Sequence, residues 1–259
     1  MRLQEAADLL GVHYQTAYGW VRDGQLPARK IRRGYEVTEA AVRAMAQQRQ
    51  RGSEPAAEIK VRDWQAQADR LYGAIVSGEE TRARRSIDRL AGHVTVIDLC
   101  DRVIAPALRR IGEDWAAGRV SIAVEHRASA ICERLLATHA TQPAGRPRGT
   151  AVVTTPPGER HGTPALMAAA CLREGRWHVH HLSADLPADE IGRFAAAVGA
   201  DLVVLSTTTR AGTVSADEAV PSVRAAVPGA VVLVGHAGDS LATLRKMTLH
   251  APAGPPARA

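Results

Sequence analysis

The spacing of apolar residues along the chain divides it into three regions. Residues 1–50 carry short helical patterns around a basic, strand-like insert, and residues 58–140 carry helical periodicity with almost no strand signal. From residue 150 onward, short apolar runs alternate with helical segments. The runs are Ala151–Thr155, Val179–Leu182, Leu202–Thr207 and Val231–Val234. Fully apolar runs of this length, separated by helices, predict buried parallel strands in βα units.

Changes in composition mark the borders between these regions. Gln50–Pro55 and Thr141–Gly149 have the composition of linkers, and Ala251–Ala259 is expected to be a disordered tail. The pattern therefore predicts a multidomain α and α/β protein. Its parts are a winged helix-turn-helix at 1–50, a four-helix bundle that caps the next domain at 58–140, a Rossmann-like parallel sheet at 150–250, and the tail at 251–259.

The first region has the order of elements of a DNA-binding domain. Residues 3–10 place apolar side chains on one helix face, Gly11 introduces a turn, and a second helix is expected from about Tyr14 to Arg22. Two short helices joined by a turn that contains Gly are typical of a helix-turn-helix. The segment Ala28–Val37 alternates basic and apolar residues around Gly34, which predicts a two-stranded wing.

The side chains expected to contact DNA are polar or basic, and they bond base edges or neutralise phosphates. They are Tyr14, Gln15, Thr16, Tyr18 and Arg22 on the second helix, and Lys30, Arg32, Arg33 and Tyr35 on the wing. Trp20 is expected to pack into the small core, and Val37–Met45 to form a further helix with Thr38 as its N-cap. The alternative is a small protein-binding unit whose basic hairpin is only a solvated edge.

Charge and composition restrict the partners. The formal net charge of +6 and the sequence pI of about 9.7 favour a polyanion such as double-stranded DNA, although an Arg-rich chain can also be basic all over. Three separated cysteines without a CxxC pair argue against a disulfide framework and against structural zinc. No apolar signal core and no run of membrane-spanning length is present, so a cytoplasmic protein without a membrane partner is expected.

The middle region predicts four helices. Two lie within residues 63–93, a third covers about Val94–Trp115 with a kink at Pro106, and a fourth covers about Ser121–Ala140. Short connections indicate an antiparallel bundle, which could serve only as a spacer or for dimerisation.

Three residues of this bundle form a candidate lid. Trp115 precedes the helix break at Gly118, and Glu125 and His126 follow it. Together they would offer a flat apolar surface, a carboxylate and an imidazole at one end of the bundle. A chance arrangement at a helix boundary is the alternative.

The third region places polar loops after its strands. Ligands of open α/β sheets bind at the carboxyl ends of the strands, where His161 follows the first strand and precedes a helix expected near Pro164. Glu159 could fix the tautomer of this imidazole, as carboxylates do for metal-bound histidines. The loops 206–209 and 235–238 join the same edge. A merely solvated histidine is the alternative, and neither a GxGxxG nor a P-loop motif is present.

The first region resembles the winged helices of the MerR and excisionase type. The resemblance covers nearly all of residues 3–42, from LQEAADLLGVHYQTAYGW through the wing to TEAAV. It implies the fold but no particular DNA sequence. Because one module of this size buries too little surface to bind tightly and selectively, a dimer or higher oligomer is expected.

The second and third regions resemble the helical cap and Rossmann-like domain of cobalamin-binding proteins. Glu159-Arg160-His161 is similar to the family signature whose histidine replaces the cofactor's own base beneath cobalt. The resemblance implies that His161 is the lower metal ligand. It also implies cofactor contacts from Glu159, Ser206, Thr208, Gly235 and His236, the last four beside the nucleotide tail.

Taken whole, the chain resembles the CarH/LitR light-sensing repressors. In that family adenosylcobalamin holds a DNA-bound tetramer in the dark, and light breaks the cobalt–carbon bond. Trp115, Glu125 and His126 match the signature that encloses the adenosyl group. The resemblance implies a non-enzymatic transcriptional regulator, a repressor controlled by adenosylcobalamin and light through its oligomeric state, as a dimer or tetramer.

Several positions depart from the family pattern. Pro164 and His236 replace glycines, Thr208 replaces a hydrophobic residue, and Ala116 replaces the histidine that binds cobalt after illumination. The last strand–helix unit is also short. One alternative is therefore a regulator with lost or altered cobalamin binding that senses another tetrapyrrole or a protein partner. Another is a corrinoid methyl-transfer shuttle, against which the winged helix argues.

Overall fold

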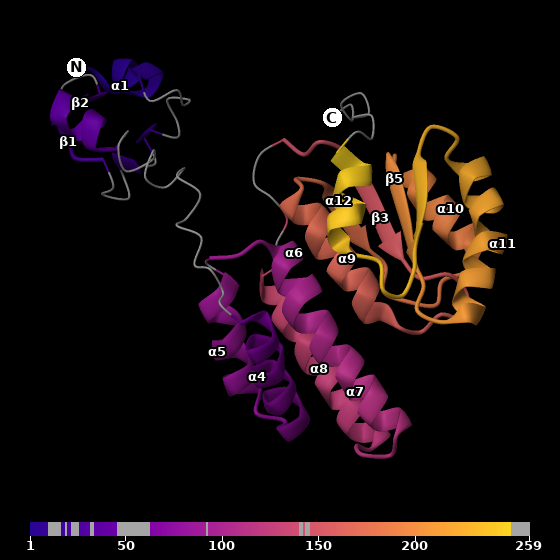
Figure 1. The fold of residues 1–259 in the computed structure, drawn as a ribbon. Coiled ribbons are helices and arrows are strands. Elements are labelled where there is room, and N and C mark those ends of the chain that lie inside the picture. Colours follow the sequence, from indigo (N-terminus) through magenta and orange to yellow (C-terminus); the bar gives the residue numbers. More distant parts are fainter. Residues whose placement is uncertain are drawn as a thin grey trace. The chain divides into compact units, whose positions relative to one another are not determined.

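The computed structural model describes most of the chain, and Figure 1 draws the other residues in grey. The described residues are 1–9, 17–18, 20–21, 26–31, 34–45, 63–91, 93–139, 142 and 146–249. The segment 251–259, expected to be a disordered tail, lies outside them. Contacts divide the chain into two compact units, Met1–Lys60 and Val61–Ala259.

The first unit contains the predicted wing. Strands β1 (Ala28–Ile31) and β2 (Gly34–Val37) pair antiparallel, and α1 (Leu3–Leu9) precedes them. A helix at 39–45 follows Thr38, whose Oγ1 accepts a hydrogen bond from the Ala41 N–H at 3.2 Å, so the predicted N-cap is confirmed. Trp20 packs against the small core as predicted. The buried residues of this core are Leu3, Ala6, Ala7, Ala17, Leu26, Val37, Val42 and Met45.

The second unit begins with the predicted helical bundle. Its helices are α4 (Trp64–Ser77), α5 (Glu80–Ala91), the run from α6 (Val96–Leu99) to α7 (Ala105–Ala116), and α8 (Ile122–His139). A π-helical turn, Cys100–Ile104, interrupts the third helix directly before Pro106. Proline cannot donate to the carbonyl four residues earlier, and the wider turn accommodates its ring.

The predicted parallel sheet follows the bundle. Its strands, β3 (Thr150–Thr154), β4 (His178–His181), β5 (Leu202–Ser206) and β6 (Val231–Gly235), are all parallel and lie in the order β4-β3-β5-β6. They confirm the four apolar runs to within a residue or two. Helices α9 (Gly162–Glu174) and α12 (Leu241–Leu249) pack on one face, and α10 (Ala188–Ala197) and α11 (Arg210–Ala226) on the other (Figure 1).

The cysteines behave as small buried hydrophobic residues. Cys100 and Cys132 lie in the core of the bundle and Cys171 lies in α9, and all three are free and buried. Burial raises the pKa of each thiol, to about 12 for Cys132 and Cys171. Within the described residues, no helix combines the length and apolar character needed to cross a membrane.

Hydrogen bonds join the bundle to the sheet domain. Glu174 at the end of α9 accepts from the Val96 N–H at 2.7 Å, and Asp101 accepts from the Ser240 hydroxyl at 2.6 Å and from the Leu241 N–H at 3.1 Å. Helix α8 also packs along α9. The bundle is therefore fixed against the face of the sheet that carries α9.

Candidate functional site

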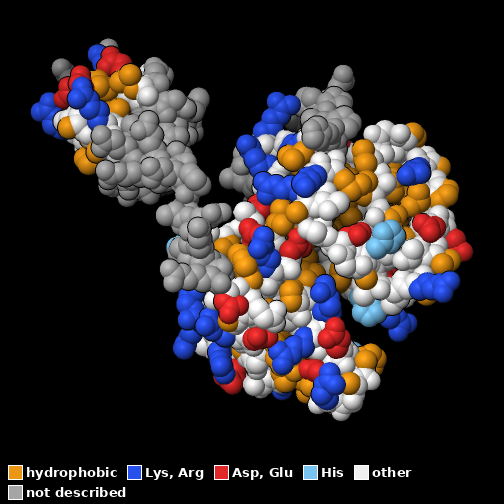
Figure 2. All heavy atoms as spheres, viewed as in Figure 1, with side chains coloured by type: hydrophobic (Ala, Val, Ile, Leu, Met, Phe, Trp, Pro, Cys, Tyr) orange, Lys and Arg blue, Asp and Glu red, His pale blue; other side chains and the backbone are white. Residues whose placement is uncertain are grey.

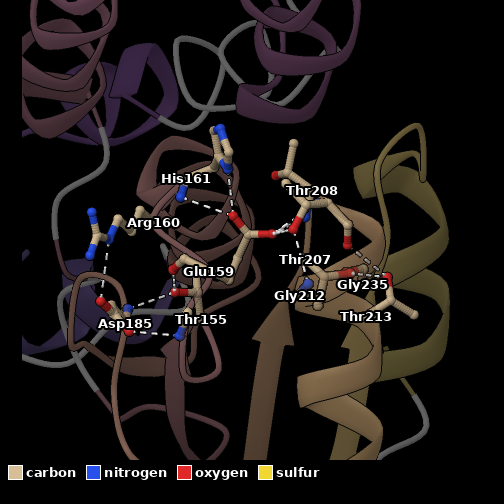
Figure 3. Close-up of polar contacts among 12 residues, drawn as sticks. Thr155, Glu159, Arg160, His161, Asp185, Thr207, Thr208, Gly212, Thr213 and Gly235 are labelled. Carbon is tan, nitrogen blue, oxygen red and sulfur yellow. Dashed lines mark hydrogen bonds and ion pairs between the residues drawn. The ribbon is translucent and has the colours of Figure 1, made fainter.

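The buried carboxylate of Glu159 organises the carboxyl edge of the sheet (Figure 3). Its side chain is fully buried, and one oxygen, Oε2, accepts from the Thr208 N–H, the Thr209 N–H and the Thr209 hydroxyl, each at 2.9 Å. The other oxygen, Oε1, accepts from the His161 N–H at 3.1 Å and lies 2.5 Å from His161 Nδ1. Glu159 thus ties the loop after β3 to the loop after β5.

The same contacts determine the charge of this group. Burial raises the pKa of the Glu159 carboxyl, but the hydrogen bonds from Thr208, Thr209 and His161 outweigh burial and lower the pKa to about 2. Glu159 is therefore a carboxylate at neutral pH, and its acceptor oxygens favour the His161 tautomer that carries a proton on Nδ1.

The side chains of Thr155 and Asp185 hold the loop that carries His161 in place. The Thr155 hydroxyl donates to the Glu159 carbonyl and accepts from the Asp185 N–H at 2.8 Å. The Asp185 carboxylate accepts from the Gly158 N–H at 2.7 Å and lies 3.6 Å from Arg160. Gly158 has a φ of 78°, which glycine adopts without strain. The loop is consequently held on both sides of the imidazole.

His161 presents its other ring nitrogen outward. It is the N-cap residue of α9, so this helix begins at Gly162, two residues before Pro164, near which the sequence predicted its start. The His161 side chain is 57% exposed, and in Figure 3 its ring points away from the sheet. With Nδ1 held by Glu159, Nε2 is the nitrogen available to a metal ion, because a metal-bound histidine usually donates its other ring N–H to a carboxylate. These residues fit the lower ligand of a cobalt ion.

The other predicted cofactor residues lie on the next two loops. Ser206 is buried at the end of β5, and Thr208 is exposed. The exposed His236 ring has Nδ1 3.3 Å from the Thr207 hydroxyl, which also donates to the Gly235 carbonyl at 3.1 Å. A Cβ at Gly235 would meet no atom within 4 Å, so space remains beside this glycine. The His236 ring therefore lies at the surface and is not packed into the sheet.

The candidate lid residues share the α7–α8 end of the bundle. Trp115 is 48% exposed in the last turn of α7. Glu125, in the first turn of α8, lies 2.5 Å from His126 Nδ1 and accepts from the Ser129 hydroxyl at 2.9 Å. Among the described residues, no hydrogen bond or ion pair links these three side chains to the His161 loop. The structure therefore brings Glu159, His161 and Thr208 together and holds the candidate lid as a separate group.

A network not predicted from the sequence supports the lid end. Asp114 is buried beside Trp115 and accepts from the Tyr72 hydroxyl and from Arg119 Nε at 2.5 Å. Hydrogen bonds from Tyr72 and Arg119 lower the pKa of Asp114. Tyr72 lies 42 residues from Asp114, so no short stretch of sequence relates the two residues. The order of apolar and charged residues around Gly118 is the one local pattern that could have indicated this network.

A pocket of about 350 Å³ opens between α8 and the sheet domain, next to His161. Its lining residues come from α8, from α9 and from the carboxyl end of β4. They are Ala130, Glu133, Arg134, Ala137, Gly162, Leu166, His181 and Ser183. Glu133 accepts a hydrogen bond from the Thr163 hydroxyl at 2.9 Å, which connects α8 to the start of α9.

The predicted DNA-contacting residues are described in part. Tyr18 is 41% exposed, and its ring centroid lies 5.7 Å from that of Tyr35 on the wing. Lys30 is exposed on β1, while Arg29 pairs with Glu36 across the hairpin at 2.8 Å. The remaining candidates lie outside the described residues. These are Tyr14, Gln15, Thr16, Arg22, Arg32 and Arg33.

Comparison with known proteins supports both parts of this architecture. Residues 1–50 match the family model of a helix-turn-helix domain, and residues 67–138 match that of a B12 binding domain. The chain is 26% identical over 268 residues to the HTH-type transcriptional repressor CarH of Myxococcus xanthus, which covers 91% of this chain and 88% of CarH.

A solved structure shares the fold of the second unit. The monomethylamine corrinoid protein of Methanosarcina barkeri superposes with a TM-score of 0.58 at 14% sequence identity, covering 71% of this chain and 98% of that chain. At this identity the likeness concerns the fold alone. The chain thus joins a helix-turn-helix domain to a B12 binding domain, and over nearly its whole length it resembles the HTH-type transcriptional repressor CarH.

Proposed function

We propose that this protein is a DNA-binding transcriptional repressor controlled by cobalamin, and that it is a regulator and not an enzyme. The observation that carries the proposal is the joining of a helix-turn-helix domain to a B12 binding domain in a chain similar to CarH along 91% of its length. A corrinoid shuttle shares only the fold of the second unit, and the DNA-binding domain gives no advantage to such a carrier.

Double-stranded DNA is the partner of the first unit. The exposed Tyr18 and Lys30 and the half-buried Tyr35 support a contact surface that spans the helix and the wing. We assign phosphate contacts to Arg32 and Arg33 at the wing tip. We assign base-edge or phosphate contacts to four residues of the second helix of the helix-turn-helix, which are Tyr14, Gln15, Thr16 and Arg22. We also propose a cytoplasmic location, since a DNA-binding regulator needs access to its DNA.

Cobalamin is the ligand of the second unit, and His161 is its proposed cobalt ligand through Nε2. Glu159 keeps the proton on Nδ1 and so leaves a lone pair on Nε2. When bound, adenosylcobalamin supplies a cobalt–carbon bond that light can break. We propose this form of the cofactor because Trp115, Glu125 and His126 offer an apolar face, an acceptor and a donor at one end of the bundle.

The nucleotide tail would pass the loops after β5 and β6. Ser206, Thr208, Gly235 and His236 are the residues proposed to border it. Open space beside Gly235 and the exposed positions of Thr208 and His236 support access to this groove. The alternative is a regulator whose site takes another tetrapyrrole or a protein partner, which the imidazole of His236 near the groove favours.

Control then follows from linkage between ligand and assembly. A ligand that binds an assembled dimer or tetramer more tightly than the single chain shifts the population toward the assembled form. Two or more helix-turn-helix domains on one assembly bind adjacent half-sites and raise DNA affinity. Light would act by breaking the cobalt–carbon bond of the adenosyl form. Because an alanine side chain cannot bind cobalt, Ala116 predicts a photoproduct that gains no second protein ligand from that position.

The deciding experiment is a visible absorption spectrum of protein incubated with adenosylcobalamin in the dark, desalted, and measured before and after green illumination. We expect a retained His-ligated spectrum that changes on illumination, and a base-off spectrum or loss of colour for His161→Ala. His178→Ala, an exposed histidine at the amino end of β4, is the matched control. Colourless wild-type protein would refute cobalamin control and leave the DNA-binding part of the proposal standing.

A further inference from the structure

The pocket of about 350 Å³ between α8 and the sheet domain contains polar groups that the described residues do not satisfy. Nε2 of His181, at the carboxyl end of β4, is buried and has no hydrogen-bond partner among those residues. Glu133 of α8 uses Oε1 to accept from the Thr163 hydroxyl at 2.9 Å, and no described group donates to its other oxygen. Because a buried polar group without a partner costs free energy, His181 favours a polar ligand in this pocket.

The charge states of these groups restrict the ligand. Burial and the nearby Arg173 lower the pKa of His181, and Glu133 opposes them only in part, so the imidazole is neutral at pH 7. Nε2 of a neutral ring either accepts from an N–H or donates to a carbonyl, whereas a carboxylate only accepts. A primary amide carries both an N–H and a carbonyl, and it therefore complements Glu133 and either tautomer of His181.

The backbone beside the pocket is strained. Ser183, one of the lining residues, has a φ of 63°, in the left-handed region that residues other than glycine rarely adopt. Its carbonyl accepts from the Thr154 hydroxyl at 3.2 Å, which holds this conformation in place. Strain of this kind persists where the surrounding structure fixes it, and it collects at ligand sites. The strained residue is thus a second, independent indication that the pocket binds a ligand.

The remaining lining and the position of the pocket indicate the source of the amide. Ala130, Ala137 and Leu166 are apolar and suit a short aliphatic stem that ends in a polar group. Gly162, which directly follows the proposed cobalt ligand His161, also lines the pocket. Figure 2 shows a recess between the bundle and the sheet domain, bordered by charged and histidine side chains. A corrin carries such stems around its rim, as acetamide arms and longer propionamide arms.

We propose that Glu133 and His181 bind one of the propionamide arms of the corrin, in the pocket that Ser183 borders. The inference rests on the proposed cobalamin site and adds the residues that select the cofactor by its periphery. The amide NH₂ donates to Glu133, and the amide also supplies the missing partner of His181 Nε2. A corrin with a carboxylate on the same arm would place a second negative charge beside Glu133, which is unfavourable. The pocket therefore selects the amidated corrin.

The test compares hydroxocobalamin with its b-, d- and e-monocarboxylic acids, each of which has one propionamide arm hydrolysed. Binding to the full chain is followed by absorption titration in the dark. We expect one of the acids to bind wild type about 10- to 100-fold more weakly than hydroxocobalamin, and Glu133→Gln to remove most of this difference. Glu218→Gln, an exposed residue of α11 on the other face of the sheet, is the matched control and should keep it.

A second variant separates ligand binding from a purely structural role. Since Nε2 of His181 has no partner among the described residues, His181→Leu should leave the urea midpoint of ligand-free protein unchanged or raise it. The same variant should bind hydroxocobalamin about tenfold more weakly. A residue that only supports the fold would show the reverse, a lower midpoint with unchanged binding, and that result would overturn the assignment of His181.

The outcomes distinguish this inference from the proposed function. Wild type that binds hydroxocobalamin and all of the acids equally, or Glu133→Gln that keeps the full difference, overturns the inference and leaves cobalamin control standing. Wild type that binds no corrin refutes both. A free small amide has the same chemistry as the arm, so propionamide alone is titrated into ligand-free protein while the ring ¹⁵N resonances of His181 are recorded. Resonances that move with propionamide but not with hydroxocobalamin would assign the pocket to a free amide and overturn the corrin arm.

Discussion

Replacing Glu159 by glutamine isolates the contribution of the carboxylate that joins the β3 and β5 loops. The change keeps the shape of the side chain but removes the charge and turns one acceptor oxygen into a donor. That new donor must face the N–H groups of Thr208 and Thr209 or the imidazole of His161. Buried donors without an acceptor cost more than the hydrogen bonds that were lost.

The magnitude follows from the pKa of this carboxyl. Its pKa in the folded protein is about 2, against an ordinary value of 4.5, and a difference of this size corresponds to about 3 kcal/mol of stability. Because the folded pKa is the lower one, this stability is fully present above pH 4.5. It is lost as pH falls from 4.5 toward 2. Glu159→Gln should therefore cost about 2–3 kcal/mol at pH 7 and progressively less below pH 4.5.

Urea unfolding of wild type and Glu159→Gln from pH 7 to pH 3 measures this difference directly. Hydrogen exchange at the Thr208 and Thr209 amides gives a local readout, since in the variant both N–H groups face either an amide donor or an uncharged, weaker acceptor. Asp189→Asn is the control, because that carboxylate is exposed, pairs with Arg193 on its own helix and should change stability far less. A cost that does not change with pH, or unaltered exchange at both amides, would refute the assigned role.

Three further outcomes follow from the described contacts and the proposed sites. Gly212→Ala should destabilise the protein by about 1–3 kcal/mol, because its Cβ would lie 2.3 Å from the buried carboxylate oxygen. The control Gly73→Ala, whose Cβ meets nothing within 4 Å in the middle of α4, should be neutral or stabilising in the same urea titration. Replacing Arg32 and Arg33 together by alanine should weaken binding to all DNA sequences and reduce the salt dependence of log K by about 2; an unchanged slope removes the wing tip from the DNA surface. Trp115→Ala should alter the photolysis rate of bound adenosylcobalamin and the ligand-linked change in mass, and a variant identical to wild type in both would exclude Trp115 from the lid.

Much of the candidate site is visible in short stretches of sequence. Strands β3 to β6 were predicted because a strand buried on both faces must be apolar at every position. His161 was found because the loop after the first strand of such a sheet lies at its carboxyl edge, and Glu159 because it is only two residues away. Helix α9 begins at Gly162, two residues before the predicted Pro164, since proline is tolerated throughout the first helical turn and does not mark the exact beginning.

Other features depend on residues that meet only after the chain has folded. Thr208 and Thr209 reach Glu159 across about 50 residues of sequence, and no local pattern relates them. The sequence determined that four parallel strands form, but the tertiary structure alone decided that β4 and β6 are the edges. Strand order comes from how helices cover the two faces, which is a long-range property. For the same reason, only the folded chain shows that Gln142 bonds the backbone N–H and carbonyl of Val179 at the β4 edge.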